Sequence, residues 1–125
     1  MAVHIPRREF ERLVLAALED LPASIRDRVD NLDIVVQNWP SPEELRRQGI
    51  PNRYGLLGLY QGIPLTQRGH YDMALPDKIT IYRRPIEAMC ATREQVVRQV
   101  RTTVIHEVAH HFGIDDDALD HTQYG

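Results

Sequence analysis

Residues 104–116 read VIHEVAHHFGIDD, and this stretch decides how the rest of the chain is interpreted. It places His106 and His110 four residues apart, with Glu107 directly after the first histidine. On a helix, side chains four residues apart lie one turn above each other on the same face, so two imidazoles can converge on one ion. The spacing therefore predicts a metal site on a helix, with a carboxylate beside it that can reach a water in an open coordination position.

A third ligand is expected shortly after this helix. Gly113 suits a left-handed turn that ends a helix, and such a turn can send the chain back so that Asp116 reaches the metal. Four other side chains are rival third ligands: Asp115, Asp117, Asp120 and His121. His111 is a weaker candidate, because it lies at the edge of an apolar stripe. Three protein ligands with a fourth position left open for water are typical of a catalytic zinc site.

The helical projection separates the two histidines from the expected core. At about 100° per residue, one side of the helix carries an apolar stripe made of Val97, Val104, Ile105, Val108 and Phe112. His106 and His110 fall on the nearly opposite side, with Glu107 on their flank. A histidine kept for core packing would lie inside the stripe, so the projection favours the ligand interpretation over a chance match.

The run from His106 to Asp116 resembles the extended zinc signature of metzincin-type peptidases, with Asp116 where the third histidine usually stands. The chain is more closely similar to the small bacterial zincin-like metallopeptidases, a minimal-matrix-metalloprotease-like family. The resemblance extends upstream through residues 58–66 (GLYQGIPLT) and 75–86 (LPDKITIYRRPI). No methionine follows Asp116, so the Met-turn beneath the zinc of metzincins is absent.

This resemblance implies a zinc-dependent peptidase with a zincin-like fold. His106, His110 and Asp116 would hold one catalytic zinc ion, and the matching signature position favours Asp116 over its rivals. Glu107 would be the general base that takes a proton from the attacking water. Zincins bind an extended peptide along an edge strand by strand addition, and residues 55–61 are the candidate strand here. The glycines of this segment suggest an edge position or a close backbone approach.

Two other functions stay open. A zinc-stabilised module would hold a peptide or protein without cleaving it, an alternative suggested by the missing Met-turn and the lack of an obvious oxyanion donor. Hydrolysis of a non-peptide amide would use the same activated water.

The candidate oxyanion donors are His70, Tyr71 and Tyr124, although a position on the loop surface is favoured for each. Cys90 is expected to be a packed thiol rather than a ligand.

Composition bounds the class of protein. A chain of 125 residues predicts one domain over residues 1–125, and its apolar (42%) and charged (26%) fractions are those of an ordinary globular protein. The formal net charge of −3 argues against a nucleic-acid partner. No apolar run approaches the roughly 20 residues of a membrane span, and no signal-peptide core is seen. The lone Cys90 cannot form an internal disulfide, so we expect a cytoplasmic protein with no membrane partner.

The remaining pattern predicts an α+β domain in which helices pack on a small twisted mixed sheet. Helices are expected at residues 6–19, 23–30, 42–48 and 93–112, with a short helical turn at 85–89. Strands are expected at residues 32–38, 55–61 and 78–83, the first of them inside the sheet because both of its faces are apolar. Residues 62–76 are expected to form a long loop. The long active-site helix lies near the C-terminus.

Overall fold

The computed structural model of the chain describes residues 3–27, 32–62 and 77–112. Its elements, in chain order, are α1 (Arg7–Glu19), α2 (Ala23–Arg26), β1 (Leu32–Gln37), α3 (Pro42–Gln48), the 3₁₀ helix η1 (Arg53–Gly55), β2 (Gly58–Gln61), β3 (Asp77–Tyr82), α4 (Arg83–Ala88) and α5 (Arg93–His111). The α+β class predicted from the order of elements is confirmed. The predicted loop at 62–76 lies outside the described residues except for Gly62. Helix α2 ends at Arg26, with Asp27 as its C-cap, so it is shorter than the helix predicted at 23–30.

The strands form a mixed sheet in the order β1-β3-β2 within the described part of the chain. Strand β1 runs parallel to β3 with Ile34 opposite Ile79, and β2 runs antiparallel to β3 with Gly58 opposite Ile81. Among the described residues β1 is thus an edge strand and β3 the central one, which differs from the interior position predicted for residues 32–38. Only one face of β1 packs into the main core, while Val35 on the other face stays partly exposed.

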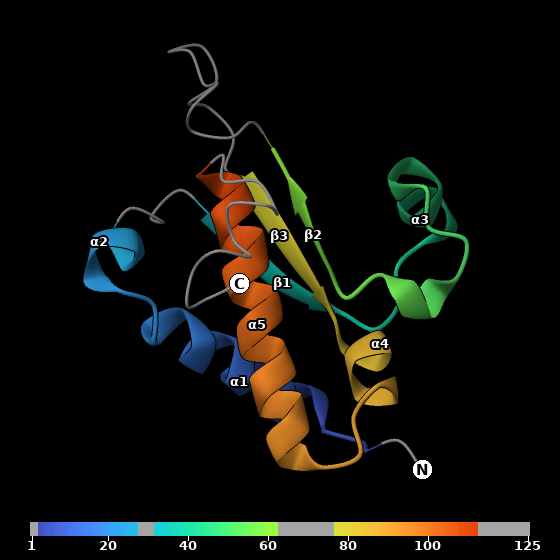
Figure 1. The fold of residues 1–125 in the computed structure, drawn as a ribbon, viewed down its shortest axis with the longest axis horizontal. Helices are drawn as coiled ribbons and strands as arrows, with labels where there is room; N and C mark the ends of the chain where they lie inside the picture. The colour runs from blue at the N-terminus through green and yellow to red at the C-terminus, as the bar shows by residue number, and fades with distance from the viewer. Residues whose placement is uncertain (1–2, 28–31, 63–76, 113–125) are drawn as a thin grey trace.

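Helices cover the two faces of this sheet unequally (Figure 1). Helices α1 and α5 pack against each other and against one face, and there the main core gathers side chains from α1, β1, β3, α4 and α5. A smaller cluster on the other face contains Leu56, Leu59 and Tyr82, with Leu45 of α3 packed against it. Strand β2, which borders both clusters, thus lies between α5 and α3.

Helix α5 begins at Arg93, as predicted, and ends at His111, one residue before the predicted end. The Thr92 hydroxyl accepts a hydrogen bond from the Gln95 backbone N–H at 3.2 Å, and the Gln95 side chain accepts one from the Thr92 N–H at 3.3 Å. This reciprocal capping box satisfies N–H groups that have no partner inside the helix. Helix α3 begins with a second capping box, from Ser41 and Glu44, and ends at Gly49 in the left-handed conformation.

The apolar stripe of α5 differs in phase from the prediction. Its buried residues include Val96, Val100, Val104 and Val108, which recur every four residues, whereas Val97 and Ile105 are only partly buried. Helix α5 also packs against β2, and this contact buries a neighbouring face of the helix, which carries Thr103 and Glu107.

Strand and helix bounds shift at two further places. Strand β2 begins at Gly58 rather than at residue 55, because Arg53–Gly55 turns as a 3₁₀ helix after Asn52, whose side chain accepts the Tyr54 N–H at 2.9 Å. Helix α4 begins directly after β3, two residues earlier than the turn predicted at 85–89. Among the described residues, none of the helices has the length and apolar character needed to cross a bilayer.

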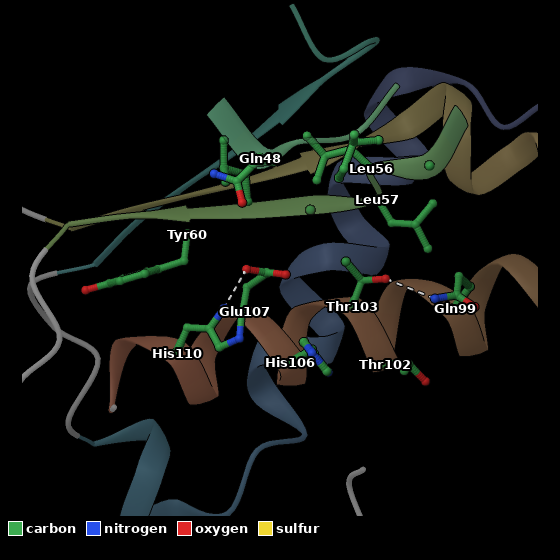
Figure 2. Close-up of a pocket in the computed structure, with 14 residues that line it drawn as sticks. Gln48, Leu56, Leu57, Tyr60, Gln99, Thr102, Thr103, His106, Glu107 and His110 are labelled. Atoms are coloured by element: carbon green, nitrogen blue, oxygen red, sulfur yellow. Dashed lines mark hydrogen bonds and ion pairs between the residues drawn. The ribbon is translucent and has the colours of Figure 1, made fainter. Parts of the chain in front are cut away.

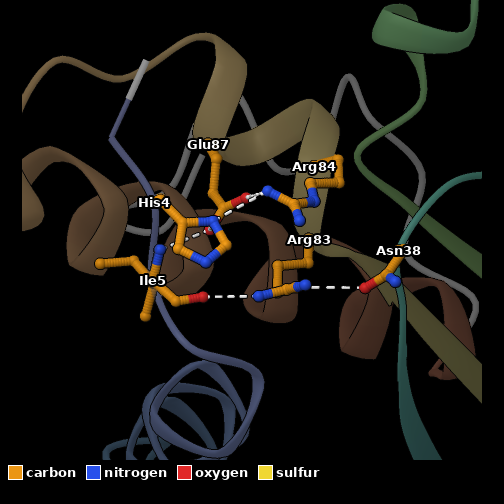
Figure 3. A network of polar contacts seen from close by, with 6 residues as sticks. All are labelled: His4, Ile5, Asn38, Arg83, Arg84 and Glu87. Carbon is orange, nitrogen blue, oxygen red and sulfur yellow. Dashed lines mark hydrogen bonds and ion pairs between the residues drawn. The ribbon is translucent and has the colours of Figure 1, made fainter. Parts of the chain in front are cut away.

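Buried charges in α4 anchor the segment before α1 (Figure 3). Arg83, 6% exposed, donates to the Ile5 carbonyl at 2.6 Å and to the Asn38 side-chain oxygen at 3.1 Å. Glu87, 2% exposed, accepts the Ile5 N–H at 2.6 Å and pairs with Arg84 at 3.3 Å. The chain entering α1 is thereby held to α4, at the end of the sheet opposite to the last turn of α5.

Candidate functional site

The last two turns of α5 bring two of the three predicted metal ligands, His106 and His110, close together. The ring centroids of His106 and His110 lie 5.3 Å apart, with their planes at 73°. Both side chains are partly exposed and line one cleft beside β2 (Figure 2). Two imidazoles at this spacing present nitrogen donors to one region of space, as the four-residue separation predicts.

Glu107 lies deeper than the sequence projection suggested. Its residue exposure is 8%, and its side chain is packed between α5 and Gly58 of β2. One carboxylate oxygen, Oε1, lies 3.3 Å from Nδ1 of His110. The carboxylate therefore sits beside the histidine pair while being largely shielded from bulk water, within the cleft that both histidines line.

The close approach of β2 to α5 depends on Gly58. A Cβ atom at this position would lie 2.7 Å from Cγ2 of Thr103 and 3.1 Å from Cγ of Glu107. Carbon atoms pack at about 3.5–4.0 Å, so only glycine fits there without a shift of the strand or the helix. The predicted alternatives for the glycines of this segment, an edge position or a close backbone approach, both hold for Gly58 in the described sheet.

The cleft has a volume of about 460 Å³. One wall comes from α3, η1 and β2 and includes Ile50, Leu57 and the backbone around Gly58, and the other comes from α5. The α5 wall continues away from the histidines through Thr103 and Gln99, whose side chains are joined by a hydrogen bond of 3.1 Å (Figure 2). Among the described residues, the carboxylates, imidazoles and basic groups of this lining are confined to His106, Glu107 and His110.

The two imidazoles and the neighbouring carboxylate agree with a zinc site that needs one further protein ligand. Two imidazoles with a carboxylate beside them are typical of zinc sites that use a third protein ligand. Within residues 3–27, 32–62 and 77–112, no three His, Cys, Asp or Glu side chains lie close enough to hold a metal ion. Asp116 lies outside the described residues, as do the rival ligands at 115, 117, 120 and 121 and the candidate oxyanion donors at 70, 71 and 124.

His111 is 1% exposed, and its Nδ1 lies 2.7 Å from Oδ2 of Asp77 at the start of β3. The same carboxylate oxygen accepts the Tyr60 hydroxyl at 2.5 Å. The sequence places His111 at the edge of the apolar stripe and gives no sign of this contact. No local signal could have shown it, because Asp77 and His111 are 34 positions apart and meet only through the sheet.

Cys90 is a buried free thiol, as predicted. Burial raises its pKa, an effect that the nearby Arg98 opposes. It precedes α5, while His106 lies thirteen residues beyond the first residue of that helix, which corresponds to about 20 Å along the axis. Cys90 is therefore far from the histidine pair.

Comparison with known proteins gives two findings. The sequence model of a family described as zincin-like metallopeptidase matches residues 29–125. Among solved structures, the chain is similar to a conserved hypothetical protein from Thermo thermophilus, with 21% sequence identity and a TM-score of 0.56, over 86% of this chain and 94% of that one. At this identity the likeness shows the fold alone. A search of curated proteins found no match.

Proposed function

This chain belongs to the zincin-like metallopeptidase family, and we propose that it is a zinc-dependent peptidase, with residues 1–125 as a single domain. The observation that carries the proposal is the grouping of His106, Glu107 and His110 along one cleft beside β2. A cytoplasmic location, expected from the lone Cys90, stays a prediction, and so does the expectation that no nucleic acid or membrane is a partner.

We assign the metal to His106 and His110, with Asp116 as the third ligand. Zinc bound in such a site supplies Lewis acidity, which polarises a substrate carbonyl and lowers the pKa of water. An aspartate in the ligand set would leave the site less positive than three imidazoles would. The support for Asp116 is its match to the family signature and its distance of six residues after His110, beyond a glycine.

Glu107 is assigned as the general base. A general base must lie within hydrogen-bond reach of the proton that it takes, and Glu107 borders the same cleft as both proposed ligands. We propose that it accepts a proton from the attacking water and passes that proton to the leaving amine. Its low exposure supports this role, because a carboxylate screened from bulk water interacts more strongly with the reacting groups.

The substrate is proposed to be an extended peptide that lies along β2. Residues 55–60 border the cleft, and strand addition would supply main-chain hydrogen bonds to the peptide. Successive side chains of an extended peptide point to opposite faces, so alternate residues would meet Ile50 and Leu57 on one side and Gln99 and Thr103 on the other. This lining favours uncharged substrate side chains near the cleaved bond.

A Glu107→Gln variant tests the proposed chemistry. We expect it to bind zinc as the wild type does and to lose turnover of a diverse peptide library by roughly 10²–10⁴-fold, the usual contribution of a general base. Glu94→Gln, an exposed change in the first turn of the same helix, is the matched control and should retain wild-type turnover. Unchanged hydrolysis by zinc-loaded Glu107→Gln would disprove the assigned role.

One observation favours the second candidate function, a zinc-stabilised module that binds a peptide or protein without turnover. Among the described residues that line the cleft, Tyr60 is the only tyrosine, and its hydroxyl donates to Asp77 rather than toward the histidine pair. This hydroxyl is therefore not directed at a site where it would stabilise an oxyanion next to the histidines. Peptide hydrolysis that is lost with a chelator and restored by zinc would reject this candidate. Cleavage of simple amides without cleavage of peptides would instead favour a non-peptide substrate.

A further inference from the structure

Three side chains next to the proposed metal ligands meet at one buried oxygen atom. Oδ2 of Asp77 lies 2.7 Å from Nδ1 of His111 and 2.5 Å from the Tyr60 hydroxyl. Both neighbours act as donors, because a carboxylate oxygen only accepts hydrogen bonds. We call Tyr60, Asp77 and His111 the Asp77 cluster.

The Asp77 cluster joins three elements, of which β2 and α5 line the cleft. Tyr60 comes from β2, Asp77 from the first position of β3, and His111 from the last turn of α5. Asp77 is 3% and His111 1% exposed, so both polar groups are removed from water, and the bond between them satisfies hydrogen-bonding groups that would otherwise be costly to bury. The mechanism proposed above gives this buried set of contacts no chemical task.

The backbone beside the Asp77 cluster is shaped to leave room for it. Gly62, just after β2, has a φ of +152°, and a Cβ atom there would overlap the Asp77 carboxylate, approaching its Cγ to 2.6 Å. A glycine at this position therefore lets the chain leave β2 directly over the carboxylate.

His111 directly follows His110 on the helix, so holding one ring restrains the direction of the other. Consecutive residues differ by about 100° around the helix axis, and His111 points into the core while His110 points into the cleft. Helix ends fray, because their last groups lack partners inside the helix. The bond from His111 to Asp77 counters fraying in the very turn that carries His110.

We propose that the Asp77 cluster positions His110 for metal binding, by fixing the last turn of α5 against β2 and β3. The proposal rests on the proposed zinc site. Asp77, His111 and Tyr60 are positioning residues here, since none of them is assigned to the metal or to the reacting atoms. The cluster differs from a contact elsewhere in the core in that His111 directly follows the proposed ligand His110 and is held to β3 and, through Asp77, to β2.

The test compares zinc affinity among folded variants, measured by competition with a chelating dye. His111→Phe removes the donor and should weaken zinc binding roughly 10–100-fold, as losses of supporting contacts around metal ligands do. His111→Asn restores a donor at the position of Nδ1 and should recover most of the affinity. The visible spectrum of the cobalt-substituted protein should change in His111→Phe and return toward wild type in His111→Asn.

Two further variants keep the result interpretable. Val100→Ala, in the buried stripe of α5 but away from the Asp77 cluster, should lower stability while leaving zinc affinity unchanged. Tyr60→Phe removes one hydroxyl only and should weaken zinc binding about tenfold, which allows a test even if His111→Phe does not fold. Wild-type affinity and cobalt spectrum in both His111→Phe and Tyr60→Phe would overturn the inference. A wild-type protein that binds no zinc would instead reject the proposed function.

Discussion

Replacing Gly58 with alanine tests the packing on which the cleft is built. The added Cβ atom would lie 2.7 Å from Cγ2 of Thr103, whereas carbon atoms normally pack at about 3.5–4.0 Å. Strand β2 and helix α5 must therefore separate by about 1 Å. A second contact of 3.1 Å, to Cγ of Glu107, directs part of this movement onto the proposed general base.

The expected cost follows from overpacking of a closely packed site. Inserting a methyl group into such a site typically costs about 1–3 kcal/mol in the free energy of unfolding. For a chain of this length, that loss lowers the midpoint of thermal unfolding by about 4–12 °C. Because misplacement of a reacting group by about 1 Å can cost roughly 10²-fold in rate, we expect peptide turnover to fall by that order.

Thermal unfolding and peptide turnover should be measured on Gly58→Ala with and without Thr103→Ser. The second change removes the methyl group that the new Cβ meets and keeps the hydroxyl that bonds Gln99, so it should recover most of the lost stability. Gly55→Ala is the matched control in the same cleft, since its Cβ would meet one side-chain methyl group, Cγ2 of Ile50, at 3.1 Å.

Two results would refute this reasoning. Wild-type stability and turnover in Gly58→Ala would show that β2 and α5 do not need the close approach. A double variant as unstable as Gly58→Ala alone would show that Thr103 is not the neighbour that limits the space.

Three further outcomes are expected from other parts of the fold. Ser41→Ala removes the capping box of α3 and should lower the free energy of unfolding by about 1 kcal/mol in urea titrations. Glu87→Leu leaves the buried Ile5 N–H without its acceptor and breaks the contact with Arg84, so it should cost about 2–4 kcal/mol in the same assay. Burial raises the pKa of Cys90, so its reactive thiolate forms at higher pH than in an exposed cysteine. Alkylation of Cys90 near pH 8 should therefore be slower in the native protein than in denaturant, and equal rates would contradict its burial.

Local signals predicted the helices well and the sheet order poorly. The Thr92–Gln95 and Ser41–Glu44 pairs mark helix starts because the capping bonds lie within four residues of sequence. The position of a strand in the sheet depends on distant partners. Val35 and Val36 suggested a strand covered on both faces inside the sheet, yet Val35 stays partly exposed, and β1 pairs only with β3 in the described sheet.

The candidate site divides in the same way. The spacing of His106, Glu107 and His110 is local, so helical geometry alone predicted that they lie near one another on α5. The cleft that they line also needs the wall formed by α3, η1 and β2. The burial of Glu107 depends on Gly58, nearly fifty positions earlier, and could be anticipated only as an unspecified close approach of the strand backbone. The bond between His111 and Asp77 had no signal in the sequence, since both residue types are common on surfaces.

Zinc content per chain is the measurement that tests the central claim most directly. Elemental analysis should find about one zinc ion per wild-type chain after dialysis, in keeping with a single catalytic site. It should find almost none in a His106→Gln/His110→Gln double variant that keeps the wild-type circular dichroism spectrum. A folded double variant that retains zinc at the wild-type level, or a wild-type protein that takes up none, would contradict the assignment of these two histidines as metal ligands.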